Sequence, residues 1–358
     1  MPEIEGLLPE PMIVDTAERV FARAAAGAAG AYDPARGLAL QAWREVEAAG
    51  LASAWVCEAL GGAGAAPVDG LAVARIAGRH AVTLPIAETL LGGWLLAEAG
   101  IALPAGPLAV VIDTRAQPEQ DAEGRISAGS AHVAWARHAT HLVLVAGRGE
   151  GAIVALVDAQ HAQVHPGTSL AGEPRDRLVL VHADSIVCAA PGAGVDAAAA
   201  SRLGALLRAQ QMAGALERIL EISLDYARNR VQFGRPIARF QAVQQELARL
   251  AGECAAAAAA AGAGASALAR HGLAAEASAR AAAAAKIRVG QAAGSGAAIA
   301  HQVHGAMGFS QEYVLQRYTR QLWSWRDDFG GETEWAEWLG RRVCAAGADA
   351  LWPELTRA

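Results

Sequence analysis

The stretch RNRVQFGRPIARFQAVQQELA, residues 228–248, separates two long helical patterns. Apolar residues recur at three- and four-residue spacing on both sides of it, which is the pattern of an amphipathic helix. They are Leu216, Ile219, Leu220 and Leu224 before the break, and Phe240, Val243, Leu247, Leu250 and Cys254 after it. Gly234 can end the first helix, and Pro236 lies just beyond it. The spacing therefore predicts two long antiparallel helices joined at residues 232–237.

The rest of the chain divides into three regions of different texture. Residues 1–106 contain mainly helical patterns, and residues 107–190 contain short β-prone runs between Gly, Pro, Asp and Glu. From residue 197 to residue 358 the patterns are helical again, with an Ala-rich segment over residues 255–300. We therefore predict a mainly α protein with an N-terminal helical domain, a small antiparallel β domain in the middle and a C-terminal helical bundle.

Composition excludes several classes of function. The net charge of −6 and the pI near 5.9 provide no basic field for nucleic acid or an anionic membrane surface. No run of about 18 strongly apolar residues is present, so we expect no membrane insertion. The four cysteines are far apart and the N-terminus has no secretory pattern, which predicts reduced thiols in a cytoplasmic protein. No His set has metal-ligand spacing, so no metal site is predicted.

Two segments carry a resemblance to a known family. The first is R-x-Q-F-G-R-P-I-x-x-F-Q-x-x-Q-x-x-L-A at 230–248, and the second is QVHGAMGFSQEYVLQRYTR at 302–320. A weaker match is AWREVEAAGLAS at 42–53 with LGGAG at 60–64. With these segments the chain resembles the flavin-dependent acyl-CoA dehydrogenases, in particular heteromeric members with a shortened middle domain. The resemblance implies that the C-terminal region is a four-helix bundle.

The resemblance also implies a non-covalently bound FAD. Residues matching Arg230, Gln232 and Phe233 reach the cofactor across a subunit interface in the family. Those matching Gln302, Gly305 and Ala306 approach its ADP part from the other subunit, and Gln241 is a further candidate. Arginine suits the pyrophosphate because it donates paired charge-assisted hydrogen bonds. Ala306 replaces the second glycine of the family pattern, which adds a methyl group and restricts positive φ.

The implied reaction is removal of the α-proton of an acyl-CoA, with transfer of a β-hydride to the flavin. It needs one carboxylate base. The family position falls near Phe329, so Asp328 is the predicted base and Asp327 and Glu332 are the alternatives. Arg326 is expected to pair with one of the two aspartates. The other family position for the base falls around Gly204 and Ala205, where no carboxylate is present.

Partners follow from the same resemblance. They are an acyl-CoA substrate, an electron-transfer flavoprotein as acceptor, and either a homo-oligomer or a heterotetramer with a homologous subunit. The expected setting is lipid or steroid catabolism, with the acyl group undetermined. Two other readings stay open: a half-site partner subunit that performs little chemistry, and a helical scaffold without flavin.

Overall fold

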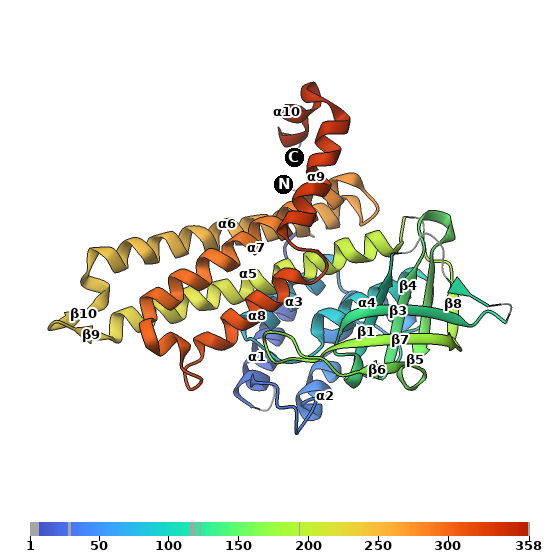
Figure 1. Cartoon of the computed structure of the whole chain (residues 1–358), viewed down its shortest axis with the longest axis horizontal. Coiled ribbons are helices and arrows are strands. Elements are labelled where there is room, and N and C mark those ends of the chain that lie inside the picture. The colour runs from blue at the N-terminus through green and yellow to red at the C-terminus, as the bar shows by residue number, and fades with distance from the viewer. Residues whose placement is uncertain (1–6, 28–29, 115–118, 122, 193, 357–358) are drawn as a thin grey trace.

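The computed structural model describes residues 7–27, 30–114, 119–121, 123–192 and 194–356 (Figure 1). Four helices come first, a pair of small sheets follows, and long helices complete the chain, so the predicted mainly α fold class is confirmed. The N-terminal helices are α1 (Pro11–Ala26), α2 (Leu40–Ala48), α3 (Pro67–Arg79) and α4 (Ile86–Glu98).

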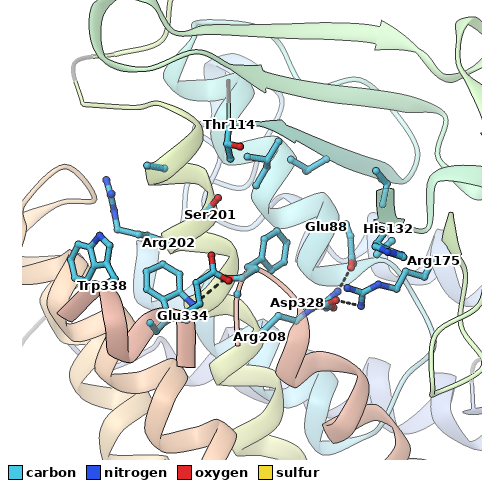
Figure 2. A pocket seen from close by; sticks show the side chains of 18 of the residues that line it. Glu88, Thr114, His132, Arg175, Ser201, Arg202, Arg208, Asp328, Glu334 and Trp338 are labelled. Atoms are coloured by element: carbon cyan, nitrogen blue, oxygen red, sulfur yellow. Dashed lines mark hydrogen bonds and ion pairs between the residues drawn. The ribbon is translucent and has the colours of Figure 1, made fainter. Parts of the chain in front are cut away.

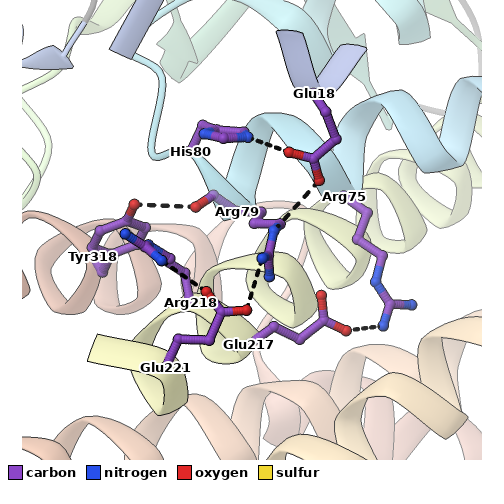
Figure 3. Close-up of polar contacts among 8 residues, drawn as sticks. All are labelled: Glu18, Arg75, Arg79, His80, Glu217, Arg218, Glu221 and Tyr318. Atoms are coloured by element: carbon purple, nitrogen blue, oxygen red, sulfur yellow. Dashed lines mark hydrogen bonds and ion pairs between the residues drawn. The ribbon is translucent and has the colours of Figure 1, made fainter. Parts of the chain in front are cut away.

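Helix α3 lies against α5 (Ala197–Asn229) at very short range. A Cβ atom on Gly78 would lie 2.0 Å from the Gln211 carbonyl oxygen, and one on Gly214 would lie 1.9 Å from the Arg75 carbonyl oxygen. Only glycine permits this approach of the two backbones. Ion pairs flank the contact, including Arg79 to Glu221 at 2.7 Å (Figure 3). The N-terminal helices are thereby held firmly to the C-terminal region.

The middle region contains two four-stranded sheets with an apolar core of their own. One has the order β1 (Leu108–Asp113), β4 (His141–Ala146), β5 (Ile153–Asp158), β8 (Val187–Ala189). The other has the order β2 (Glu119–Gln120), β3 (Ile126–Ala134), β7 (Arg175–Ala183), β6 (Gln163–His165).

The expectation of a wholly antiparallel β domain is wrong for one pair of strands. Strands β1 and β4 are parallel, with Leu108 opposite His141. After β1 the chain builds β2 and β3 in the other sheet, and this long crossover returns it to the same end of the first sheet. Residues 115–118 and 122 of that connection lie outside the described part of the chain.

The C-terminal region is the predicted four-helix bundle, made of α5, α6 (Gln241–His271), α7 (Glu276–His304) and α8 (Leu315–Asp327). Small side chains let its helices approach closely. A Cβ on Gly264 would lie 2.6 Å from Leu206, and one on Gly296 would lie 2.8 Å from Leu216. The break between α5 and α6 falls within residues 228–248, as predicted, but Gly234 does not end the first helix. Helix α5 ends at Asn229, and the short hairpin β9 (Val231–Gln232) and β10 (Arg235–Pro236) joins it to α6, with Gly234 in the hairpin turn.

Two further helices, α9 (Glu332–Ala346) and α10 (Ala348–Thr356), lead away from the bundle (Figure 1). The helices in the described part of the chain include none that combines the length and apolar character needed to cross a bilayer. Cys254 is buried, whereas Cys57, Cys188 and Cys344 are exposed, and all four are free thiols.

Candidate active site

A cavity of about 700 Å³ opens where the β domain meets the bundle (Figure 2). Strands β1 and β3 form one wall, the first turns of α5 form the second, and the loop after α8 with α9 forms the third. The lining residues used below are Glu88, His132, Arg175, Arg202, Arg208, Asp328, Phe329, Gly330, Glu334, Trp335 and Trp338.

A buried network of charges closes one side of the cavity. Arg208 of α5 is only 3% exposed. Its Nε donates to Asp328 at 2.9 Å, one terminal nitrogen donates to Gln211 at 2.6 Å, and the other donates to Glu88. Arg175 donates to the second oxygen of Asp328. Both oxygens of the Asp328 carboxylate therefore have a guanidinium partner.

The three predicted base candidates lie in different surroundings. Asp328 lines the cavity, as expected for a base, and its role stays a prediction. Asp327 is exposed at the end of α8 and does not line the cavity. Glu332 is absent from the lining too, because it turns to Arg326 at 2.7 Å. The expectation that Arg326 pairs with an aspartate is therefore wrong.

The loop that carries Asp328 is held by side chains that the sequence analysis did not select. Lys286, buried in α7, donates from Nζ to the carbonyl oxygens of Arg326 and Gly330, both at 2.6 Å. Burial lowers the pKa of Lys286 to about 8. Trp335 donates from Nε1 to the Phe329 carbonyl oxygen at 3.0 Å. The available signal was that Lys286 is the only lysine in the sequence.

The second family position for a base faces the same loop. A Cβ on Gly204 would lie 2.5 Å from the Phe329 ring, so glycine is required there. Phe329 itself has φ of 56°, an uncommon value for a bulky residue. The contact explains why position 204 holds no carboxylate: a side chain there would displace the loop.

A protonatable carboxyl lies behind the charged side of the cavity. Glu173 is buried and accepts a hydrogen bond from the Gln321 amide at 2.8 Å. Burial raises the pKa of Glu173 to about 7. In the folded protein this carboxyl therefore holds a proton over a pH range in which it is ionised in the unfolded chain.

We expect Glu173 to make stability fall as pH rises from about 4.5 to about 7. The pKa of Glu173 is higher in the native state than in the unfolded chain, so the native state binds more protons between these two pKa values. Above about pH 7 the buried carboxylate is ionised, and the loss of stability is complete. Glu173→Gln should be more stable than wild type at pH 8, by on the order of 3 kcal/mol, and nearly equal to it near pH 4.5. Urea unfolding at both pH values measures this, and a difference independent of pH would contradict it.

The predicted cofactor segments lie at the opposite end of the bundle from the β domain (Figure 1). Phe233 and Gly234 form the turn of the β9–β10 hairpin, with φ of 53° and 78°. Asn-Gly is the usual choice for such a turn, and phenylalanine there costs backbone strain. The Phe233 side chain is also 91% exposed. A strained and exposed aromatic side chain indicates a contact outside this chain.

Both segments meet at this end of a single chain. The Tyr226 ring, just before the hairpin, stacks on His304 at 4.3 Å, and its hydroxyl donates to the His304 carbonyl oxygen at 3.3 Å. Gly305 follows with φ of 58°, and Ala306 lies in the short helix Gly305–Phe309. Of the two glycines in the family pattern, the one that this chain retains, Gly305, is the one that adopts a positive φ. One chain thus brings the two segments together by itself. The expectation that they approach FAD from different subunits stays a prediction.

The exposed groups at this end suit a dinucleotide pyrophosphate. They are Arg230, Gln232, Gln241 and Gln302, together with the open backbone at Gly305, which has no neighbour within 4 Å of a Cβ position. In the cavity, Phe329, Trp335 and Trp338 offer aromatic surface for a flat ring. The hairpin end therefore has groups that fit the phosphates of FAD, and the cavity has aromatic side chains that fit its flat ring. However, Asn229 lies 21 positions after Arg208 in the same helix, which corresponds to about 30 Å along α5.

His132 and Trp135 are aromatic residues of the β domain that lie close together in the sequence but have different environments. His132 lines the cavity, whereas Trp135 is buried against Tyr32 and His138. Trp135 is therefore a core residue. No group of three or more metal-ligating side chains occurs among the described residues.

Comparison with known proteins places these features in context. Residues 195–326 match the family model described as the C-terminal domain of acyl-CoA dehydrogenase. The curated relative "Acyl-CoA dehydrogenase IpdE2" of Mycobacterium tuberculosis is 30% identical over 229 residues, which cover 62% of this chain and 64% of the relative. The match thus spans somewhat less than two thirds of that relative.

Solved structures show the same fold over nearly the whole chain. The Tcur3481-Tcur3483 steroid ACAD has a TM-score of 0.81 and 24% identity, over 94% of this chain and 97% of the other. The ChsE4-ChsE5 complex from Mycobacterium tuberculosis has a TM-score of 0.79 and 24% identity, over 93% of this chain and 98% of the other.

Proposed function

Because the chain belongs to the acyl-CoA dehydrogenase family, we propose that it takes part in FAD-dependent α,β-dehydrogenation of an acyl-CoA thioester. The observation that carries this proposal is the cavity of about 700 Å³, which combines aromatic walls with buried, fixed charges next to a rigid loop. Such a site can exclude water, orient a thioester and hold a carboxylate near its α-carbon.

Each part of the chain has a distinct task in this proposal. When bound, FAD supplies the acceptor for the β-hydride. Arg230 and Gln302 hold its phosphates, and Phe233 packs on its adenine or flavin end. Trp335 and Trp338 bound the space for the flat ring and the acyl group, while Arg208 and Arg175 keep Asp328 in place.

The distance between the cavity and the hairpin end of the bundle leads to a proposal about the oligomeric state. Since about 30 Å of helix lies between the cavity and the hairpin, the segments of one chain serve the cavity of a neighbouring subunit. The exposed side chains of Phe233, Met307 and Phe309 at the hairpin end are then covered by that neighbour. We propose a homo-oligomer or a heterotetramer with a homologous subunit. An electron-transfer flavoprotein is the proposed acceptor, in the cytoplasm.

A second candidate function is that of a half-site partner subunit. It is favoured by the absence of a carboxylate at Gly204 and by the two guanidinium groups that occupy Asp328. The fold likeness to the two-protein ChsE4-ChsE5 complex is in line with it. In this case the chain would donate its hairpin to the partner's cavity and perform no dehydrogenation in its own.

The two functions differ in what the purified protein does. We expect a yellow preparation, alone or co-expressed with a homologous subunit, from which acid releases FAD. Light scattering should show at least a dimer. If the chain is catalytic, thioesters from a panel that runs from butyryl-CoA to steroid side-chain CoA esters should reduce the flavin under anaerobic conditions, which is followed as loss of its visible absorbance. A colourless protein in both preparations would refute the cofactor proposal, and a flavin-loaded monomer would refute the shared site.

A further inference from the structure

Among the residues that the structure describes, three carboxylates line the cavity: Glu88, Asp328 and Glu334. Glu88 and Asp328 are both paired with Arg208, and Asp328 is paired with Arg175 as well. Guanidinium groups thus occupy both oxygens of Asp328 and one oxygen of Glu88, and a substrate proton would compete with these contacts. Glu334 lies on the α9 side of the cavity, away from this network (Figure 2).

The position of Glu334 differs from that of the other two in three respects. It is exposed and has no ion pair within the described part of the chain. Its Oε2 would lie 3.1 Å from a Cβ atom built on Gly330. Because position 330 has no side chain and φ of 94°, the carboxylate of Glu334 folds across the loop toward the cavity.

The elements around Glu334 are rigid, which a proton acceptor requires. Lys286 fixes the Gly330 carbonyl oxygen at 2.6 Å, and Trp335, the next residue of α9, fixes that of Phe329 at 3.0 Å. Phe329 in turn rests against Gly204. The loop between α8 and α9 therefore cannot move away from the carboxylate without breaking these contacts.

Resting on the proposed function, we propose that Glu334 is the base that removes the α-proton of the acyl thioester. The α C–H bond breaks and its proton passes to the Glu334 carboxylate, while the β C–H bond breaks as a hydride that bound FAD accepts. The acyl chain loses two electrons and gains a double bond, and the flavin is reduced by the same two electrons.

Exchange of the α-hydrogen isolates this step. The full-length holoprotein, with its homologous subunit if FAD retention requires one, is incubated in D₂O with butyryl-CoA and with a steroid side-chain CoA ester. Deuterium at the α-carbon is followed by mass spectrometry, and thioester binding is measured by calorimetry. Glu334→Gln should slow exchange at least 100-fold with binding changed less than about threefold, and Glu334→Asp should retain an intermediate rate.

The matched control is Glu337→Gln, on the same helix and paired with Arg341 at the surface, which should exchange like wild type. Exchange by Glu334→Gln at the wild-type rate would overturn the assignment while leaving the proposed function intact. Exchange lost in Asp328→Asn but kept in Glu334→Gln would give the role to Asp328. A wild-type holoprotein that exchanges none of the thioesters would refute the proposed function, and the assignment with it.

Discussion

Replacement of Arg208 by methionine should lower the free energy of unfolding by about 3–5 kcal/mol. Arg208 is the shared partner of Glu88 and Asp328, and all three side chains are buried. Methionine keeps much of the volume but removes the guanidinium group that both buried carboxylates share. Asp328 then keeps Arg175 as a partner, whereas Glu88 loses its ion pair with Arg208. The cost of an uncompensated buried charge exceeds that of losing the ion pair itself.

Urea unfolding at neutral pH measures the effect, with Arg249→Met as the control. Arg249 pairs with Glu246 three residues away and is exposed, so its loss should cost at most about 1 kcal/mol. Adding Glu88→Gln to Arg208→Met should recover part of the stability, because it removes one of the orphaned charges. A loss below about 1 kcal/mol in Arg208→Met would show that the network is not a structural requirement.

Arg230→Ala should weaken FAD binding by about 1.5–3 kcal/mol, which is about 10- to 150-fold in dissociation constant. The Arg230 side chain is exposed, and its backbone amide already has the Tyr226 carbonyl oxygen as its partner. The substitution should therefore leave the fold intact while removing a charge-assisted hydrogen bond to a phosphate.

Quenching of flavin fluorescence on titration of the flavin-stripped protein measures this constant, and urea unfolding checks the fold. Arg249→Ala, another exposed arginine of the bundle, should bind FAD like wild type. Unchanged FAD affinity in Arg230→Ala would remove this end of the bundle from the cofactor site.

Local patterns in the chain were sufficient for much of the architecture. The three-and-four spacing on either side of the break predicts α5 and α6. Gly234 and Pro236 mark the region of the break, but α5 already ends at Asn229, and the hairpin that follows it was not predicted. The short β-prone runs of residues 107–190 predict the longer strands β1, β3, β4, β5 and β7. These features depend on neighbours a few residues apart, so periodicity and turn chemistry reveal them. The same patterns missed the two- and three-residue strands β2, β6 and β8, which exist through pairing with longer strands.

The chemistry of the cavity could not be read in this way, because its groups are distant in sequence. Arg208 meets Glu88 and Asp328 across 120 residues in each direction. Lys286 reaches a loop more than 40 residues away, and Glu334 is brought over Gly330 by the start of α9. A charged residue looks the same in sequence whether it is solvated or buried and paired. Packing of α4, α5 and α7 against the loop after α8 supplies the burial and the partners of Glu88 and Asp328, which only the tertiary structure reveals.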